Sequence, residues 1–151
     1  MTSSGQEPEI TFALASEADL RGVAELDLLV TGQAKPEFWA SNLARTVTGD
    51  TSTFIIARHG SKIVGLILGT IGAWEFGSPA TGWVHAIFVH PDFRNRGIAS
   101  ELLAEIKTFF SGRGINTIRT MLHVDDKLLM SFFRFHGLSA GPYVELEATI
   151  D

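Results

Sequence analysis

The sequence contains no cysteine among its 151 residues. A chain without thiols forms no disulfide, ligates no metal through sulfur and carries no acyl group on a cysteine during catalysis. Its five histidines are scattered and show no H-E-x-x-H or similar ligand spacing. We therefore expect no metal in the functional site.

Basic residues are also scarce. Lysine and arginine number 12 against 17 aspartates and glutamates, which gives a formal net charge of -5. A general nucleic-acid binder needs a basic face, so nucleic acid is not an expected partner. Any site for an anion must therefore be local.

Long hydrophobic runs are absent too. No run approaches the roughly 20 apolar residues of a membrane-spanning helix. The N-terminus, MTSSGQEPE, lacks the charged start and apolar middle of a secretory signal. These features predict a cytoplasmic protein with no membrane partner.

The length and the 45% of hydrophobic residues suit one globular domain with a real core. Residues 1–8 are small and polar and are expected to form a loose N-terminal tail. Residues 9–151 are expected to form the single domain, because no repeat or linker interrupts them.

The spacing of apolar residues predicts strands that alternate with helices. Ser16 begins the first helix with a capping-box pattern, and Pro36 suits the first turn of the second. A third helix begins at about Arg96, with Ile98, Leu102, Ile106 and Phe109 on its apolar stripe, and a fourth contains residues 128–133. Strands are predicted at 9–15, 52–58, 62–71, 83–89, 115–122 and 143–150. This order is that of a mixed α/β sheet in which a helix crosses over between strands 83–89 and 115–122.

The stretch VHPDFRNRGIAS, residues 89–100, joins a strand to a helix and contains two arginines and a glycine. Free main-chain N–H groups and the helix dipole make such a helix start suited to a phosphate or a diphosphate. The alternative is an ordinary turn with solvated arginines. Neither G-x-x-x-x-G-K-[ST] nor G-x-G-x-x-G is present, which disfavours nucleoside triphosphates and NAD.

These residues resemble a known family. Val89, Pro91, Arg94, Gly97, Ile98 and Ala99, between an apolar strand and an amphipathic helix, are similar to motif A of the GNAT superfamily of N-acetyltransferases. FFRFHGL, residues 132–138, is similar to the late F-Y-x-x-x-G-F motif of that family. The predicted order of elements also matches the GNAT fold.

The resemblance implies a mostly antiparallel central sheet flanked by helices, with a splay between the strands at 83–89 and 115–122. It implies acetyl-CoA as cosubstrate, with its pantetheine arm pairing with Ile87, Phe88 and Val89. The diphosphate would lie on the N–H groups of Arg94, Asn95, Arg96, Gly97, Ile98, Ala99 and Ser100.

The late motif departs from the family at one position. Many relatives have a tyrosine there that protonates the leaving thiolate, whereas this chain has Phe133, which can pack against the cofactor but cannot donate a proton. Tyr143, the only tyrosine, is a candidate substitute, with edge packing as the alternative. Asp126 matches a frequent asparagine of the family, which implies a part in cofactor binding together with Phe133. The alternative is that Asp126 caps the following helix.

The general base is left open. Glu75 lies between Trp74 and Phe76, whose partial desolvation would raise its pKa. His85 has a suitable ordinary pKa of about 6.5, and alternation would place it on one strand face with Trp83 and Ile87. His123 and Asp125, or a relay of waters, are further alternatives.

The resemblance implies transfer of an acetyl group to a primary amine by direct attack in a ternary complex. The acceptor would be a small amine, a protein lysine or a chain N-terminus, and nearby Glu37 and Glu75 favour a cationic one. Phe38, Trp39, Trp74 and Trp83 are expected to line its groove or to pack in the core. The alternative function is a catalytically silent acyl-CoA sensor. Relatives often form homodimers, and the sequence leaves the oligomeric state open.

Overall fold

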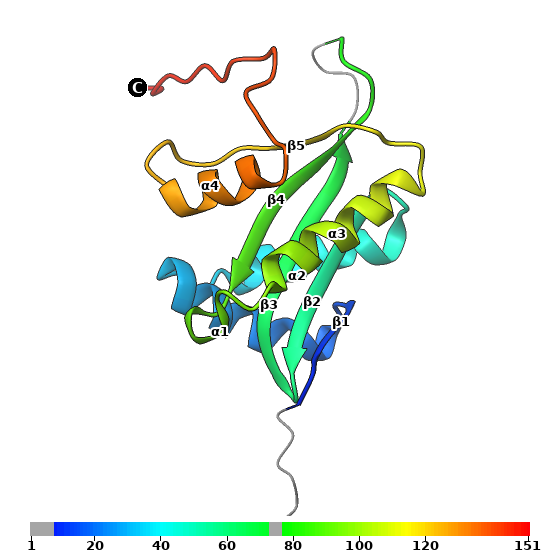
Figure 1. Ribbon diagram of the computed structural model, residues 1–151, viewed down its shortest axis with the longest axis vertical. Coiled ribbons are helices and arrows are strands. Elements are labelled where there is room, and N and C mark those ends of the chain that lie inside the picture. Colours follow the sequence, from blue (N-terminus) through cyan, green and yellow to red (C-terminus); the bar gives the residue numbers. More distant parts are fainter. Residues whose placement is uncertain (1–7, 73–76) are drawn as a thin grey trace, which may run out of the picture. The chain divides into compact units, whose positions relative to one another are not determined.

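A computed structural model describes residues 8–72 and 77–151 (Figure 1). Two compact units follow one another along the chain, the first ending at Thr120 and the second beginning at Met121. The elements are β1 (Ile10–Leu14), the 3-10 helix η1 (Glu17–Asp19), α1 (Leu20–Thr31), α2 (Pro36–Thr48), β2 (Ser52–His59), β3 (Lys62–Gly72), β4 (Thr81–Val89), the 3-10 helix η2 (Pro91–Phe93), α3 (Ile98–Ser111), β5 (Ile118–Thr120) and α4 (Lys127–Phe135).

The first unit is built on a five-stranded sheet in the order β1-β2-β3-β4-β5. Neighbouring strands are antiparallel except β4 and β5, which are parallel and are connected through α3. β5 pairs with only three residues of β4, from Gly82 to Val84. The rest of β4, as far as Val89, therefore has no strand beside it on that edge within the described residues.

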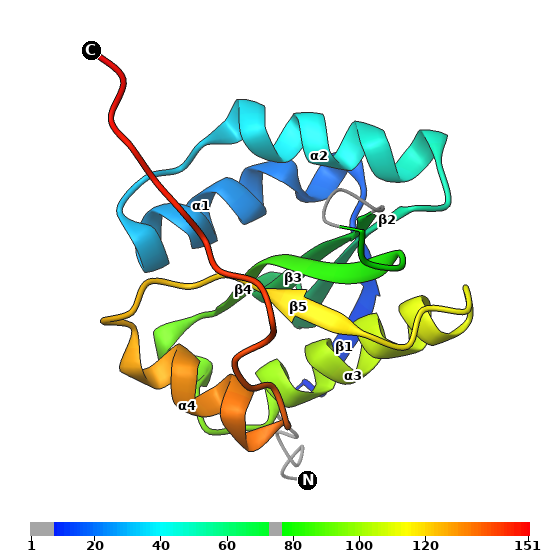
Figure 2. The same cartoon turned by 90° about the horizontal axis from the view of Figure 1, so that it is seen from above.

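Helices cover both faces of this sheet (Figure 2). On one face, α1 and α2 bury a cluster made of Val23, Leu26, Trp39, Leu43, Phe54, Ile56, Leu66 and Leu68. On the other face, α3 packs through Ile98, Leu102, Ile106 and Phe110. Gly69 and Gly82 permit this close approach, because a Cβ atom at Gly69 would collide with Ile106 and one at Gly82 would collide with Phe110. The predicted stripe was wrong in its last member, since Phe110 is buried and Phe109 is only partly so.

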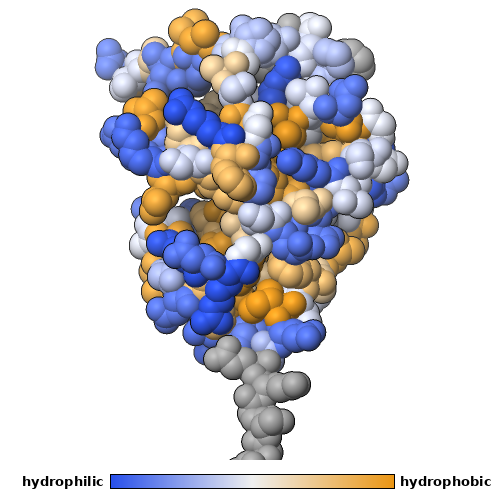
Figure 3. All heavy atoms as spheres, viewed as in Figure 1, coloured by the Kyte–Doolittle hydropathy of each residue, from blue (hydrophilic) through white to orange (hydrophobic). Residues whose placement is uncertain are grey.

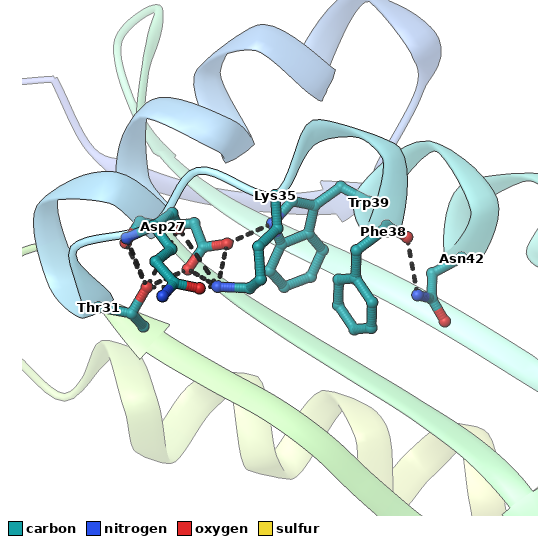
Figure 4. A network of polar contacts seen from close by, with 7 residues as sticks. Asp27, Thr31, Lys35, Phe38, Trp39 and Asn42 are labelled. Carbon is teal, nitrogen blue, oxygen red and sulfur yellow. Dashed lines mark hydrogen bonds and ion pairs between the residues drawn. The ribbon is translucent and has the colours of Figure 1, made fainter.

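A buried carboxylate joins α1 to α2 (Figure 4). Asp27 is fully buried and accepts hydrogen bonds from Trp39 Nε1 at 2.8 Å, Lys35 Nζ at 2.8 Å and Thr31 Oγ1 at 2.6 Å. Lys35 reaches it from a left-handed backbone conformation, with φ of 46°. A buried charge is costly unless it is paired and hydrogen-bonded, and all three partners meet that need here.

The same network fixes aromatic side chains against β4. The Trp39 ring meets Phe88 of β4 edge to face, with centroids 5.9 Å apart, and it contacts Phe54 of β2 at 5.4 Å. Phe38, the preceding residue, is 43% exposed. The hydrogen bond from the Trp39 indole thus adds to the packing of α2 over the sheet.

The second unit contains α4 and a long extended segment. Asp126 Oδ1 accepts a hydrogen bond from Leu129 N at 3.1 Å, which confirms that it caps α4. Phe133 is buried, and its ring lies 5.3 Å from that of Phe132. From residue 139 onward, no helix or strand is formed.

Three predicted boundaries were wrong. The third helix begins at Ile98 rather than near Arg96, because Asn95 and Gly97 have positive φ angles of 63° and 78°. The strand predicted at 115–122 shrinks to β5, which has a partner over three residues only. The closing strand predicted at 143–150 does not form, because its alternating pattern finds no pairing edge in the described chain.

The unpaired closing segment leaves large apolar side chains in solvent, including Val144, Leu146 and Ile150. On the face shown in Figure 3, hydrophobic side chains are interspersed with hydrophilic ones. No helix among the described residues is both long enough and apolar enough to cross a membrane.

The Asp27 network generates a stability prediction. Asp27→Ala should lower the free energy of unfolding by about 3 to 5 kcal/mol, because it leaves the Lys35 ammonium and the buried Trp39 N–H without their acceptor. Chemical denaturation of both proteins measures the difference.

Asp50→Ala is the matched control. The Asp50 side chain is 97% exposed and lies 3.6 Å from Arg113, so its loss should change stability by less than about 1 kcal/mol. Equal small losses in the two variants would show that the network does not stabilise the fold.

Candidate functional site

The loop between β4 and α3 presents unpaired main-chain donors. The first helical hydrogen bond runs from Glu101 N to Gly97 O at 3.0 Å, so the amides of Ile98 and Ala99 precede it. Neither amide has a hydrogen-bond acceptor within the described residues. Such amides, together with the positive end of the helix dipole, form an anion-binding position.

Gly97 keeps this position open. Its φ of 78° is one that residues with a side chain rarely adopt, and a Cβ atom built on it would meet no heavy atom within 4 Å. Within the described residues, no atom therefore fills the position that a side chain at 97 would take. A glycine at this position leaves room for a close approach to the main chain, and the predicted binding of a diphosphate here stays a prediction.

Two arginines flank the amides. Arg94 is exposed, and the Arg96 guanidinium lies over the ring of Phe93, 4.8 Å from its centroid. Phe93 is buried, so its ring is a fixed surface under this guanidinium. Both cations add to the field of the helix terminus.

The unpaired edge of β4 leads directly into this loop. Ile87, Phe88 and Val89 are all partly buried and lie beyond the last residue paired with β5. Their main-chain groups on that edge have no neighbouring strand within the described residues. A bound molecule with amide groups can use such an edge as an added strand does.

His85 occupies an irregularity of β4. The register shifts by one residue between the Leu68–Ala86 and Gly69–Val84 pairs, which makes His85 the extra residue of a β-bulge. Its Nε2 lies 2.7 Å from Thr70 Oγ1 of β3. Bulges reorient side chains and are frequent beside active sites.

The bulge corrects one prediction about the strand faces. Trp83 lies opposite Thr70, whereas Ile87 lies opposite Ile67, and these two β3 residues point to opposite sides of the sheet. Regular alternation of side chains along the strand had predicted that His85, Trp83 and Ile87 share one face of the sheet. The extra residue shifts the alternation, so Trp83 and Ile87 occupy different faces.

His85 has a perturbed pKa. Partial burial of the ring lowers its pKa below the ordinary value, and the positive charge of Arg45 on α2 lowers it further. The side chain is nevertheless solvent-exposed. His85 is thus a neutral, accessible imidazole near neutral pH, which is the form that accepts a proton.

The other candidate catalytic residues lie outside the described residues or in the second unit. Glu75 and its neighbour Trp74 lie outside the described residues. Tyr143 belongs to the extended segment of the second unit and is 43% exposed. In that unit Asp125 donates its main-chain N–H to His123 Nδ1 at 3.1 Å, and both residues are exposed.

Sequence reasoning missed two residues near His85. Thr70 belongs to another strand, and only the register of β3 against β4 shows that it reaches the imidazole. Arg45 comes from α2, and no local pattern indicates that its charge acts on β4. Trp39, weighed as a groove residue, is instead 1% exposed and belongs to the core.

Comparisons with known proteins agree with this geometry. A model of the acetyltransferase (GNAT) family matches residues 20–138. Acetyltransferases of Pectobacterium atrosepticum and Sodalis glossinidius are each 27% identical to the chain over 92 residues. That alignment covers 61% of this chain and 61% of each relative, so the chain spans about three fifths of the length of these relatives.

Solved structures share the fold. Aminoglycoside N-acetyltransferase AAC(6')-Iy in complex with coenzyme A matches with a TM-score of 0.81 and 15% identity, over 96% of this chain and 97% of that one. PaiA N-acetyltransferase from Thermoplasma acidophilum, also with coenzyme A, matches with a TM-score of 0.77 and 18% identity, over 90% and 93%. The family model matches most of the chain, including the loop between β4 and α3. The chain therefore belongs to the acetyltransferase (GNAT) family.

Proposed function

We propose that the chain transfers an acetyl group from acetyl-CoA to a primary amine by direct attack in a ternary complex. The observation that supports this most is the continuity of the unpaired β4 edge with the open helix start at Gly97. One continuous surface thus offers amide partners and then an anion position. Acetyl-CoA, when bound, supplies an activated acetyl thioester.

The residues present fit this cosubstrate. The amides of Ile98 and Ala99 have no acceptor within the described residues, and the open position at Gly97 supports a diphosphate there. The main chain of Ile87, Phe88 and Val89 is the proposed partner of the pantetheine arm. Arg94, Asn95, Arg96 and Ser100 complete the proposed cofactor site.

His85 is the proposed general base. A primary amine is protonated near neutral pH and must lose a proton before it can attack a carbonyl. The lowered pKa keeps the imidazole ready to take that proton, and the contact with Thr70 Oγ1 orients the ring. Glu75 and Tyr143 stay candidates for further proton transfers.

The acceptor is proposed to be a small amine, a protein lysine or an N-terminus. Several solved structures with this fold are named aminoglycoside acetyltransferases, which supports an acceptor bearing an amine. The net charge of -5 favours an acceptor with positive charge.

A catalytically silent acyl-CoA sensor is the second candidate function. Phe133 supports it, because the late helix offers no hydroxyl at the position where many relatives have one. Both candidates bind coenzyme A. Only the enzyme releases free thiol when acetyl-CoA is mixed with a panel of small amines and lysine peptides, so thiol release separates the two.

The cofactor site predicts the effect of a charge at Gly97. Gly97→Glu should abolish detectable binding of coenzyme A in calorimetry, because the carboxylate would project into the proposed diphosphate position. The positive φ adds backbone strain of about 1 to 3 kcal/mol, which any side chain there would carry.

Gly114→Glu controls for that strain. Gly114 has a φ of 74° and also has open space around it, but it follows the far end of α3. The control should bind coenzyme A as the wild type does. If both variants lose binding equally, strain rather than the site explains the loss.

The base assignment predicts a pH dependence. Because His85 acts as a neutral base with a lowered pKa, kcat/KM should fall with decreasing pH through a pKa below about 6.5. Arg45→Gln removes a cation that lowers this pKa, so the acid limb should move to higher pH. An NMR titration of the imidazole should show the same upward movement.

Lys107→Gln is the control for loss of a positive charge, since Lys107 lies on α3 at the opposite face of the sheet. It should leave both the acid limb and the titration unchanged. If Arg45→Gln leaves the acid limb of kcat/KM at the same pH while the imidazole titration moves, His85 is not the base.

A further inference from the structure

His85 lies on the sheet face that α1 and α2 cover. Its Nε2 is 2.7 Å from Thr70 Oγ1. Thr70 follows Leu66 and Leu68 along β3 at intervals of two residues, and both leucines belong to the core cluster under α1 and α2. Alternate residues of a strand share a face, so Thr70 points to the same side as these leucines. The imidazole therefore faces the layer that these two helices form.

The last turns of α2 pass over the same part of the sheet. Near the start of α2, Trp39 contacts Phe88 of β4. Just beyond the end of α2, Thr51 O accepts a hydrogen bond from Ile71 N of β3 at 2.7 Å. The helix thus runs from the level of Phe88 to the level of Ile71, and the register of β3 against β4 places His85 between these two levels.

Three side chains form a stripe along α2. Phe38, Asn42 and Arg45 follow one another at intervals of four and three residues, which places them on one side of the helix. Figure 4 shows Phe38 and Asn42 on this common side, where Asn42 Nδ2 donates a hydrogen bond to Phe38 O at 2.8 Å. Burial lowers the pKa of His85, and the charge of Arg45 lowers it further, so this side of α2 borders the imidazole.

Arg45 has no anionic partner among the described residues. Its side chain is exposed, and it takes part in no ion pair within that part of the chain. By contrast, Lys35 at the other end of α2 pairs with Asp27 at 2.8 Å. The guanidinium of Arg45 is therefore available to an anionic group of a bound molecule.

An unpaired cation beside the proposed base is unfavourable for a simple amine acceptor. It disfavours the transfer of a proton to His85, and it repels the ammonium form in which a primary amine arrives. Both effects are relieved if the acceptor brings a negative group to Arg45. A guanidinium presents planar N–H donors that match the two oxygens of a carboxylate.

The phosphates of the proposed cosubstrate lie elsewhere along β4. His85 and Val89 are four residues apart, which is about 13 Å in an extended strand. The loop with the proposed diphosphate position begins only after Val89, whereas α2 runs away from that end of β4. The unpaired charge of Arg45 therefore concerns the acceptor rather than the cosubstrate.

We infer that Arg45 binds a carboxylate of the acceptor, and that the acceptor is an amino acid. This inference rests on the proposed function, whose acceptor it narrows. The net charge of -5 favours acceptors with an ammonium group on approach, and Arg45 then selects, on contact, those that also carry a carboxylate. Phe38, which is 43% exposed on the same stripe, offers an apolar surface to the hydrocarbon part of such a molecule.

Turnover of paired acceptors tests the inference. Thiol release from acetyl-CoA is measured at neutral pH with a panel of amino acids, each beside its own amide, which lacks the carboxylate. The proteins are the wild type, Arg45→Gln, Arg45→Lys and the charge control Lys107→Gln. An amino acid and its amide differ in the basicity of the amine, so the ratio of their kcat/KM values is compared between proteins. Thermal melting verifies that each variant is folded.

We expect Arg45→Gln to lower kcat/KM for the preferred amino acid about tenfold, mostly through KM, which is the size of one hydrogen bond to a charged group. The same variant should not lower the value for the amide. Arg45→Lys should restore part of the preference, because it keeps the charge but loses the planar donors. Lys107→Gln should keep the ratio of the wild type.

A binding measurement decides the case in which no acceptor is turned over. The N-acetyl amino acids of the same panel keep the carboxylate and lack the basic amine. In an NMR titration they should raise the pKa of the His85 imidazole in the wild type, because a bound carboxylate offsets the charge of Arg45. Their amides should leave the pKa unchanged, and Arg45→Gln should abolish the rise.

Failure of the proposed function and failure of this inference give different results. If nothing is turned over but the carboxylate-dependent rise is present and requires Arg45, the proposed transfer fails and the carboxylate site stands. The inference is overturned if the wild type and Arg45→Gln turn over amino acids and amides in the same ratio. Without turnover, it is overturned if no N-acetyl amino acid moves the pKa of His85.

Discussion

The incomplete pairing of β4 is the constraint on which the site depends. One edge of β4 pairs with β3 along its length, whereas the other edge meets β5 over three residues and then stands alone. Unpaired main-chain groups on a strand edge need a partner, and a bound molecule with amide groups meets that need. Because the same strand continues into the loop before α3, its direction also sets where the free helix amides lie.

The bulge at His85 falls where pairing with β5 has just ended. An extra residue bends a strand and increases its local twist. The same irregularity displaces His85 from regular alternation and brings it to Thr70. A single inserted residue thus accounts for the placement of the imidazole.

The sequence predicted the features that depend on local signals. Pro36 at the first position of α2, the capping pattern at Ser16 and the glycine at 97 each act within a few residues, and the structure has them where they were expected. The features that the sequence could not predict depend on pairing between segments that are distant along the chain. The bulge, the short β5 and the unpaired residues 143–150 are all properties of two strands together. An alternating pattern indicates that a segment could join a sheet, but it does not show whether an adjacent strand is available to pair with it.

Long-range charge effects were equally hidden. Arg45 and Lys62 are ordinary exposed cations in the sequence, and only the packing of α2 and the β2–β3 hairpin brings their charges to His85 and Phe93. The burial of Asp27 was hidden for the same reason. A lone aspartate in an amphipathic helix reads as a solvated residue, yet it is fully buried because Trp39 and Lys35 approach it from α2 and its connection.

The distribution of charge reconciles a negative chain with a proposed anionic cosubstrate. At physiological ionic strength, screening reduces interactions between exposed charges beyond about 8 Å. The net charge of -5 therefore acts weakly on a phosphate at the proposed position before α3, where Arg94 and Arg96 flank the first amides of the helix. The distant carboxylates act mainly on the approach of molecules from solution, and they favour a cationic amine. One molecule can thus present a locally positive cradle and an overall negative surface, which suits two reactants of opposite charge.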